Sequence, residues 1–184
     1  MESRPVLYVV VSGAAPAREL PALISALTDD WDTCVITTPD GARFFDLARV
    51  AELTGHPVRT SFKDPDAPDV LPPASAFAAA PATFNTINKW AAGISDTLAL
   101  GLLNEATGLG LPIVTVPWPN AALARHPAFG RSVATLRGCG ITVIFDPAHL
   151  PDDEAPGQAK FPWGDLRAEL ARMRTALGGG HAPA

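Results

Sequence analysis

Small hydroxyl and amide side chains gather in three short segments of this sequence, each at the end of an apolar run. The segments are Ser12-Gly13-Ala14, Thr37-Thr38 and Pro81–Thr86, which reads PATFNT. Each precedes a helical pattern, so its hydroxyl groups would lie beside the free N–H groups and positive dipole end of a helix N-terminus. Such an arrangement favours a bound phosphate group.

The simpler interpretation of each segment is a helix cap, because Ser, Thr and Asn are the residues that cap helices best. For any one segment alone, the cap is the better interpretation. Three such segments at consecutive strand ends, with neither a P-loop nor a GxGxxG spacing, favour a mononucleotide phosphate site instead.

The elements that would position these segments alternate between strands and helices. The predicted strands cover residues 5–11, 32–38, 57–60, 74–80, 111–116 and 141–145, the third being short. The predicted helices cover residues 18–27, 40–55, 85–105, 127–137 and 164–177, with Asp40 as N-cap and Gly55 as stop of the second. The proline- and aspartate-rich segment 62–73 is expected to be an irregular loop.

Alternating strands and helices predict a doubly wound α/β fold, a single Rossmann-like (flavodoxin-like) domain with a parallel sheet and helices on both faces. Ligands of such sheets bind beyond the carboxyl ends of the strands, where the three segments fall. We expect the domain to span residues 1–177 and the Gly-rich residues 178–184 to form a flexible tail.

Composition excludes several classes of function. The chain has 184 residues and a formal net charge of −5, without the basic stripe of a nucleic-acid-binding protein. No apolar run approaches the roughly 20 residues needed to cross a bilayer, and the acidic start is unlike a signal peptide, so we expect a cytoplasmic protein without a membrane partner. Cys34 and Cys139 lack metal-ligand spacing, and Cys34 is expected to be buried and inert.

The segment Pro81–Thr86 and the helix pattern after it resemble the homo-oligomeric flavin-containing cysteine decarboxylases. Members of this family carry a Pro-Ala-Ser-Ala-Asn-Thr turn before a helix with spaced Lys, Ala, Gly, Asp and Leu, which this chain matches with Lys89, Ala91, Gly93, Asp96 and Leu98. The family's second motif is matched less closely by residues 117–124, followed by His126-Pro127. The resemblance covers roughly Pro5 to Phe145.

The resemblance implies FMN as the cofactor and a homo-oligomer, a trimer or higher, acting on a small molecule or a peptide. It implies that the flavin contacts Thr83, Phe84, Asn85 and Thr86 and that its phosphate contacts Ser12, Gly13 and Thr38. Asn120 matches an asparagine of the family's active site, which lies between subunits. Chemically, Asn85 offers amide donors for the carbonyl oxygens of the ring and Phe84 an apolar wall. Trp118 either stacks on the flavin or covers the core.

The sequence also departs from the family. The decarboxylases have a histidine on the approach to the fourth strand, and the equivalent position here is close to Ala67. His56 lies too early and is expected to close a helix, and His126 is expected to start one. Asn120 therefore favours an FMN-dependent cysteine decarboxylase, and the absent histidine favours a flavin-binding regulatory or partner protein. A flavin prenyltransferase is a third alternative.

Overall fold

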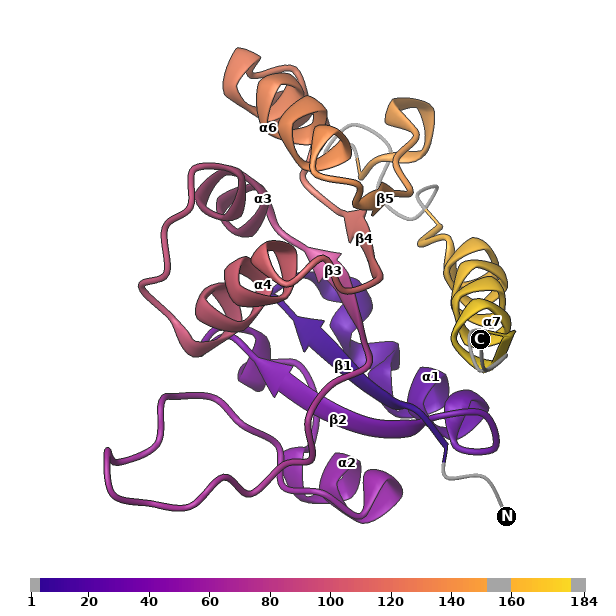
Figure 1. Ribbon diagram of the computed structural model, residues 1–184. Helices are drawn as coiled ribbons and strands as arrows, with labels where there is room; N and C mark the ends of the chain where they lie inside the picture. Colours follow the sequence, from indigo (N-terminus) through magenta and orange to yellow (C-terminus); the bar gives the residue numbers. More distant parts are fainter. Residues whose placement is uncertain (1–3, 152–159, 180–184) are drawn as a thin grey trace, which may run out of the picture.

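A parallel sheet forms the centre of the protein (Figure 1). The computed structural model describes residues 4–151 and 160–179, and within them five strands pair in the order β2-β1-β3-β4-β5. The strands are β1 (Val6–Val11), β2 (Asp32–Thr37), β3 (Ala76–Ala82), β4 (Ile113–Pro117) and β5 (Thr142–Val143). All pairs are parallel, which confirms the predicted flavodoxin-like sheet. The chain steps from β1 to β2 and then crosses to β3 on the other side of β1, so the strand order reverses between β1 and β3.

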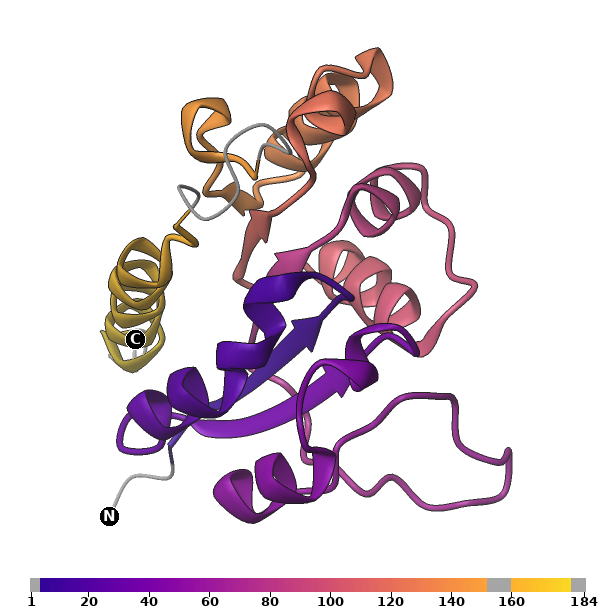
Figure 2. The same ribbon diagram turned by 180° about the vertical axis from the view of Figure 1, so that it is seen from behind.

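Helices cover both faces of this sheet, as Figures 1 and 2 show from opposite sides. On one face pack α1 (Leu20–Leu27), α2 (Leu47–Thr54) and α7 (Trp163–Gly179). On the other face pack α3 (Phe84–Ala91), α4 (Leu98–Gly108) and α6 (Pro127–Gly138). The shorter helices are η1 (Ala15–Glu19), η2 (Gly41–Arg43), α5 (Ala121–Ala124) and η3 (Pro147–His149). Because side chains alternate along a strand, the continuous apolar runs supply both cores.

The predicted helix over residues 40–55 is shorter than expected. Asp40 does not cap it: its side chain accepts no capping hydrogen bond, and only the short η2 follows. Asp46 is the N-cap of α2, because its carboxylate accepts the N–H groups of Ala48 and Arg49. Gly55 ends the helix with a φ of 73°, as predicted.

The predicted helix over residues 85–105 is two helices. Gly93 turns the chain with a φ of 71°, and Thr97 then caps α4 by accepting the N–H of Leu100 at 3.2 Å. The apolar side chains of Leu98, Leu100 and Leu103 are buried within the chain itself. The spacing of apolar residues gave no sign of this break, because α3 and α4 both pack apolar side chains into the same core.

Two further differences concern the edges of the fold. The predicted strand 57–60 is reduced to one bridge between Ile36 and Arg59, and the segment 62–73 is irregular, as predicted. Helix α7 includes Gly178 and Gly179, which the sequence analysis assigned to the tail, and residues 180–184 lie outside the described residues. Among the described helices, none is both long and apolar enough to cross a membrane.

Candidate functional site at the carboxyl ends of the strands

The three hydroxyl-bearing segments meet at one end of the sheet. Because β1 pairs in parallel with both β2 and β3, the segments that follow these strands are neighbours. The hydroxyl oxygens of Ser12 and Thr86 lie 2.8 Å apart, and those of Thr83 and Thr86 lie 3.1 Å apart. The N–H of Thr38 donates to the carbonyl of Val11 at 2.9 Å. The structure therefore brings the predicted residues Ser12, Thr38, Thr83 and Thr86 to the β1/β3 reversal point.

The hydroxyl of Thr83 caps α3 and also remains partly accessible. Its backbone is extended, and its oxygen accepts the N–H of Thr86 at 3.4 Å. Ser12 and Thr86 are buried, so their hydroxyl groups stabilise the turn from inside the fold. Asn85 is exposed, and Thr83 and Phe84 are partly exposed. The first N–H groups of a helix lack intrahelical acceptors, so this turn presents donors together with the Asn85 side chain.

Two glycines allow the turns after β1 and β2 to lie in close contact. A Cβ atom on Gly13 would lie 2.8 Å from the Cβ of Asp40 and 3.1 Å from its carbonyl carbon. A Cβ atom on Gly41 would lie 2.4 Å from the Thr37 hydroxyl oxygen and 2.7 Å from the carbonyl oxygen of Val11. Gly41 also donates its N–H to the Thr38 hydroxyl oxygen at 3.1 Å. The turns after β1 and β2 thus pack directly on each other beside Thr38.

Asn120 lies on the loop after β4. Its side chain caps α5, since its Oδ1 accepts the N–H of Leu123 at 2.9 Å, and the residue is exposed. The loop is tied to β3 by the bond from Trp118 N–H to the carbonyl of Ala82, at 2.8 Å. In the described part of the chain, no hydrogen bond joins Asn120 to Ser12, Thr83 or Thr86.

An aromatic cluster adjoins the start of α3. The ring of Phe84 meets that of His126 edge-on with 5.7 Å between centroids, and stacks on Phe129 at 6.2 Å. His126 caps α6, as predicted, because its Nδ1 accepts the N–H of Ala128 at 3.1 Å. Trp118 packs edge-on against Phe161 at 5.1 Å, which favours its core-covering interpretation.

No histidine occupies the place of the family's histidine. Ala67 lies in the irregular segment, where Lys63 pairs with Asp69 at 2.8 Å and the hydrogen bond from Lys63 lowers the pKa of that carboxyl. His56 pairs with Asp32 at 2.8 Å, at the amino end of β2 and away from the site. Lys89 pairs with Asp96 at 2.6 Å on the surface.

The cysteines and the metal-ligating side chains give no second catalytic centre in the described residues. Cys34 is buried as predicted, and burial raises the pKa of its thiol to about 12, so the thiolate is disfavoured. Cys139 is exposed at the end of α6. Within residues 4–151 and 160–179, no three His, Cys, Asp or Glu side chains gather as a metal site.

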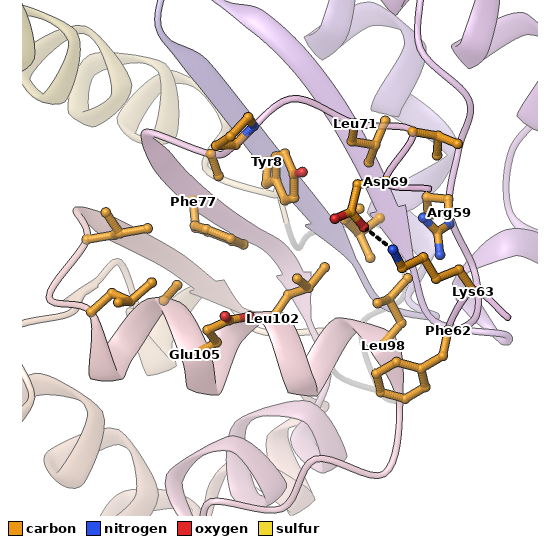
Figure 3. Close-up of a pocket in the computed structure, with 17 residues that line it drawn as sticks. Tyr8, Arg59, Phe62, Lys63, Asp69, Leu71, Phe77, Leu98, Leu102 and Glu105 are labelled. Atoms are coloured by element: carbon orange, nitrogen blue, oxygen red, sulfur yellow. Dashed lines mark ion pairs between the residues drawn. The ribbon is translucent and has the colours of Figure 1, made fainter. Parts of the chain in front are cut away.

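Sequence reasoning missed a cavity of about 580 Å³ between the sheet, α4 and the segment 62–73 (Figure 3). None of the predicted site residues lines it. The signal that could have located it is the group of apolar residues Phe62, Val70 and Leu71 within an otherwise polar and proline-rich loop.

Comparison with known proteins places this geometry in a family. The sequence matches the family model described as Flavoprotein over residues 1–174. It is 30% identical to mouse phosphopantothenoylcysteine decarboxylase over 153 residues, which are 75% of this chain and 71% of that protein. It is 32% identical over 101 residues to a cysteine/cysteine sulfinic acid decarboxylase of an unknown prokaryotic organism, covering 52% of this chain and 27% of that protein.

Solved structures share the fold. The cypemycin decarboxylase CypD superimposes with a TM-score of 0.72 at 24% identity, covering 98% of this chain and 97% of that one. The FMN-dependent cysteine decarboxylase TvaF from thioviridamide biosynthesis superimposes with a TM-score of 0.73 at 20% identity, covering 94% and 99%. The resemblance to the flavin-containing cysteine decarboxylases is confirmed, and the chain belongs to the Flavoprotein family.

Proposed function

We propose that this protein binds FMN at the β1/β3 reversal point and decarboxylates a cysteine-bearing peptide or small conjugate. The observation that carries the proposal is the cluster of Ser12, Thr83 and Thr86 at this end of the sheet. In flavodoxin-like sheets with this strand order, the reversal point is where FMN binds. The relatives named above are decarboxylases, one of them FMN-dependent.

The residues present fit a flavin mononucleotide. The partly exposed backbone at Gly13 and the hydroxyl of Thr38 suit the phosphate, because they add donors with little bulk. The exposed amide of Asn85 suits the carbonyl oxygens of the ring, and Phe84 offers its face an apolar contact. Thr83 is accessible to the flavin, whereas Ser12 and Thr86 act mainly by holding the turn.

Asn120 is the residue that we assign to the substrate. Its Oδ1 is engaged by Leu123, and its Nδ2 donors, which make no hydrogen bond among the described residues, can bind a substrate carboxylate. When bound, the flavin supplies an acceptor for two electrons. Asn120 orients the substrate but cannot remove a thiol proton, and no histidine stands at position 67 to do so. General-base assistance is typically worth about 10²–10⁴-fold in rate, so we expect slow turnover of phosphopantothenoylcysteine.

We further propose that the site is completed by a second copy in a homotrimer or a higher assembly. The apolar residues Leu98, Leu100 and Leu103 of α4 do not contribute to this proposal, because they are buried within their own chain. The resemblance supports it, because the active site of the family lies between subunits and contains the asparagine that Asn120 matches. We expect this assembly in the cytoplasm, with a small molecule or a peptide as substrate.

The experiment measures carbon dioxide release and flavin reduction after flavin-loaded protein is mixed with phosphopantothenoylcysteine or with peptides ending in Cys. Turnover that is lost in Asn120→Ala supports the decarboxylase. Asp66 and Asp69, the carboxylates beside Ala67 in the sequence, are the alternative bases. Undiminished turnover of phosphopantothenoylcysteine in Asp66→Asn and Asp69→Asn variants would contradict the expectation that the absent histidine slows this reaction.

A flavin-binding regulatory or partner protein is the second candidate. The observation that favours it is Ala67 at the position of the family's histidine, in an irregular loop. Tight FMN binding without turnover of any cysteine-bearing compound would support this candidate against the decarboxylase.

A further inference from the structure

The cavity missed by sequence reasoning has three walls, which Figure 3 shows. Tyr8, Ile36 and Phe77 line it from the sheet, and Leu98 and Leu102 line it from α4. The segment 62–73 forms the third wall. The volume of about 580 Å³ lies within the range of about 300–1,000 Å³ typical of small-molecule sites.

The cavity exists because an irregular segment replaces a helix on this part of the sheet. On the opposite face, α1 and α2 pack over the strands, with Leu20 and Val50 in a common core. The segment 62–73 cannot form such a helix, since prolines interrupt it at four positions: Pro65, Pro68, Pro72 and Pro73. The segment therefore packs over the sheet less closely than a helix would, and a cavity remains between them.

Specific contacts fix the position of this segment. The hydroxyl of Tyr8 donates to the carbonyl of Pro72 at 2.9 Å, and Lys63 pairs with Asp69 at 2.8 Å. The ring of Phe62 lies over Gly101 of α4, where an added Cβ atom would be 3.4 Å from it. The segment is thus anchored to the sheet at one end and to α4 at the other.

Apolar side chains dominate the lining and its edge. Three large apolar residues of the lining are well exposed: Phe62 at 60%, Val70 at 50% and Leu109 at 68%. Exposed apolar side chains that converge on a cavity favour an apolar ligand, because its binding removes them from water.

The charges of the lining are not all paired. Asp69 pairs with Lys63 at 2.8 Å, which lowers the pKa of its carboxyl, and the charge of Arg59 also contributes to lowering this pKa. Arg59 donates to the carbonyl of Ser61 at 3.1 Å and lies within ion-pair distance of no carboxylate among the described residues. Arg59 is partly buried, and its remaining guanidinium donors form a fork suited to a carboxylate. Glu105 on α4 is exposed, so water screens its charge more strongly.

We propose that this cavity binds an amphipathic carboxylate, with its apolar chain between the sheet and α4 and its carboxylate on Arg59. The ligand class follows from the apolar lining together with one unpaired, partly buried guanidinium. The site is distinct from the proposed flavin site and does not depend on it.

The test is isothermal titration calorimetry of the protein as purified with three probes of equal chain length: octanoate, n-octanol and octyltrimethylammonium. We expect octanoate to bind most tightly. Arg59→Gln should weaken octanoate binding about tenfold or more, because a charge-assisted hydrogen bond is lost, and leave octanol binding unchanged. Glu105→Gln should bind octanoate at least as tightly as the parent protein. Arg49→Gln on α2 is the control, because it also removes one arginine, and it should leave the affinity for each probe unchanged.

A variant on the exposed rim separates loss of the site from loss of folding. Phe62→Ala removes a side chain that is 60% exposed, so the protein should fold and bind both octanoate and octanol more weakly. Absence of octanoate binding, or equal binding of octyltrimethylammonium, would overturn the proposal. If the parent protein does not bind octanoate and Phe62→Ala or Arg59→Gln dissociates an oligomer, the cavity is instead an interface with a second copy of the chain. The flavin content of Arg59→Gln should equal that of the parent.

Discussion

At the scale of single residues, capping and ligand binding are compatible roles for the hydroxyl groups at the strand ends. Thr83 caps α3 through its oxygen, yet it remains partly exposed and its hydroxyl also lies near that of Thr86. Ser12 is almost fully buried, so its contribution is to fix the turn. Different residues of the cluster can therefore have different roles, some capping a helix or fixing the turn and others also contacting a phosphate.

Asn85 gives the first prediction. Asn85→Ala should weaken FMN binding roughly five- to tenfold, because an exposed pair of amide donors worth about 1 kcal/mol is lost. Lys89→Ala is the matched control on the same helix and should leave binding unchanged, since Lys89 is paired with Asp96. Quenching of FMN fluorescence during titration of flavin-free protein measures both. Equal affinities in the two variants would contradict the assignment of Asn85.

Cys34 gives a second prediction, on stability against pH. Burial raises the pKa of its thiol from 9.0 to about 12, so the folded state favours the protonated thiol. The resulting stability is fully present below pH 9 and is lost as the pH rises from 9 to about 12. Burial also raises the pKa of the Tyr8 hydroxyl, from 10.0 to about 12, and so acts on stability in the same direction.

Urea denaturation between pH 8 and pH 11 tests this. The parent protein should lose stability with rising pH, and Cys34→Ala should flatten the part of the curve that begins near pH 9. Cys139→Ala is the control, because Cys139 is exposed. A pH dependence that Cys34→Ala leaves unchanged would assign the alkaline loss to other groups.

At the scale of elements, close backbone contacts place the site. The turns after β1 and β2 approach so closely that Gly41 has no room for a side chain. Gly41→Ala should therefore destabilise the protein by about 1–3 kcal/mol, because the nearest atoms include the backbone of Val11 and cannot move freely.

The control for Gly41→Ala is Gly130→Ala in α6. An added Cβ atom there has no neighbour within 4 Å, so alanine should stabilise the helix by about 0.5–1 kcal/mol. Thermal unfolding followed by circular dichroism measures both variants. A neutral Gly41→Ala would mean that the two turns separate easily.

At the scale of the whole molecule, the prediction concerns the number of copies. We predict a homo-oligomer, a trimer or a higher assembly, because the resemblance implies an active site between subunits that includes Asn120. Light scattering at micromolar concentration measures the mass. A monomer that retains FMN and turns over a cysteine peptide would show that one chain completes the site.

The sequence by itself determined the fold class and the end of the sheet at which the site lies. A strand that is buried on both faces has apolar residues at successive positions. The strands at residues 5–11, 32–38 and 74–80 could therefore be recognised from their own sequences. The carboxyl ends of parallel strands share one edge, and this alone predicted that Ser12, Thr38 and Thr83 would meet there. The PATFNT turn indicated the family, and the comparisons confirm this assignment.

Only the tertiary structure decided the contacts between distant segments. Helical periodicity continued across Gly93 because the two helices on either side pack into one core, so the break at residues 92–97 had no signature in the apolar pattern. Asp46 rather than Asp40 caps α2 because the turn after β2 must first pack against Gly13. The apolar residues of the loop 62–73 indicate that it packs on something apolar, but they do not identify the side chains of β1, β3 and α4 that complete the cavity, because those contacts join distant segments.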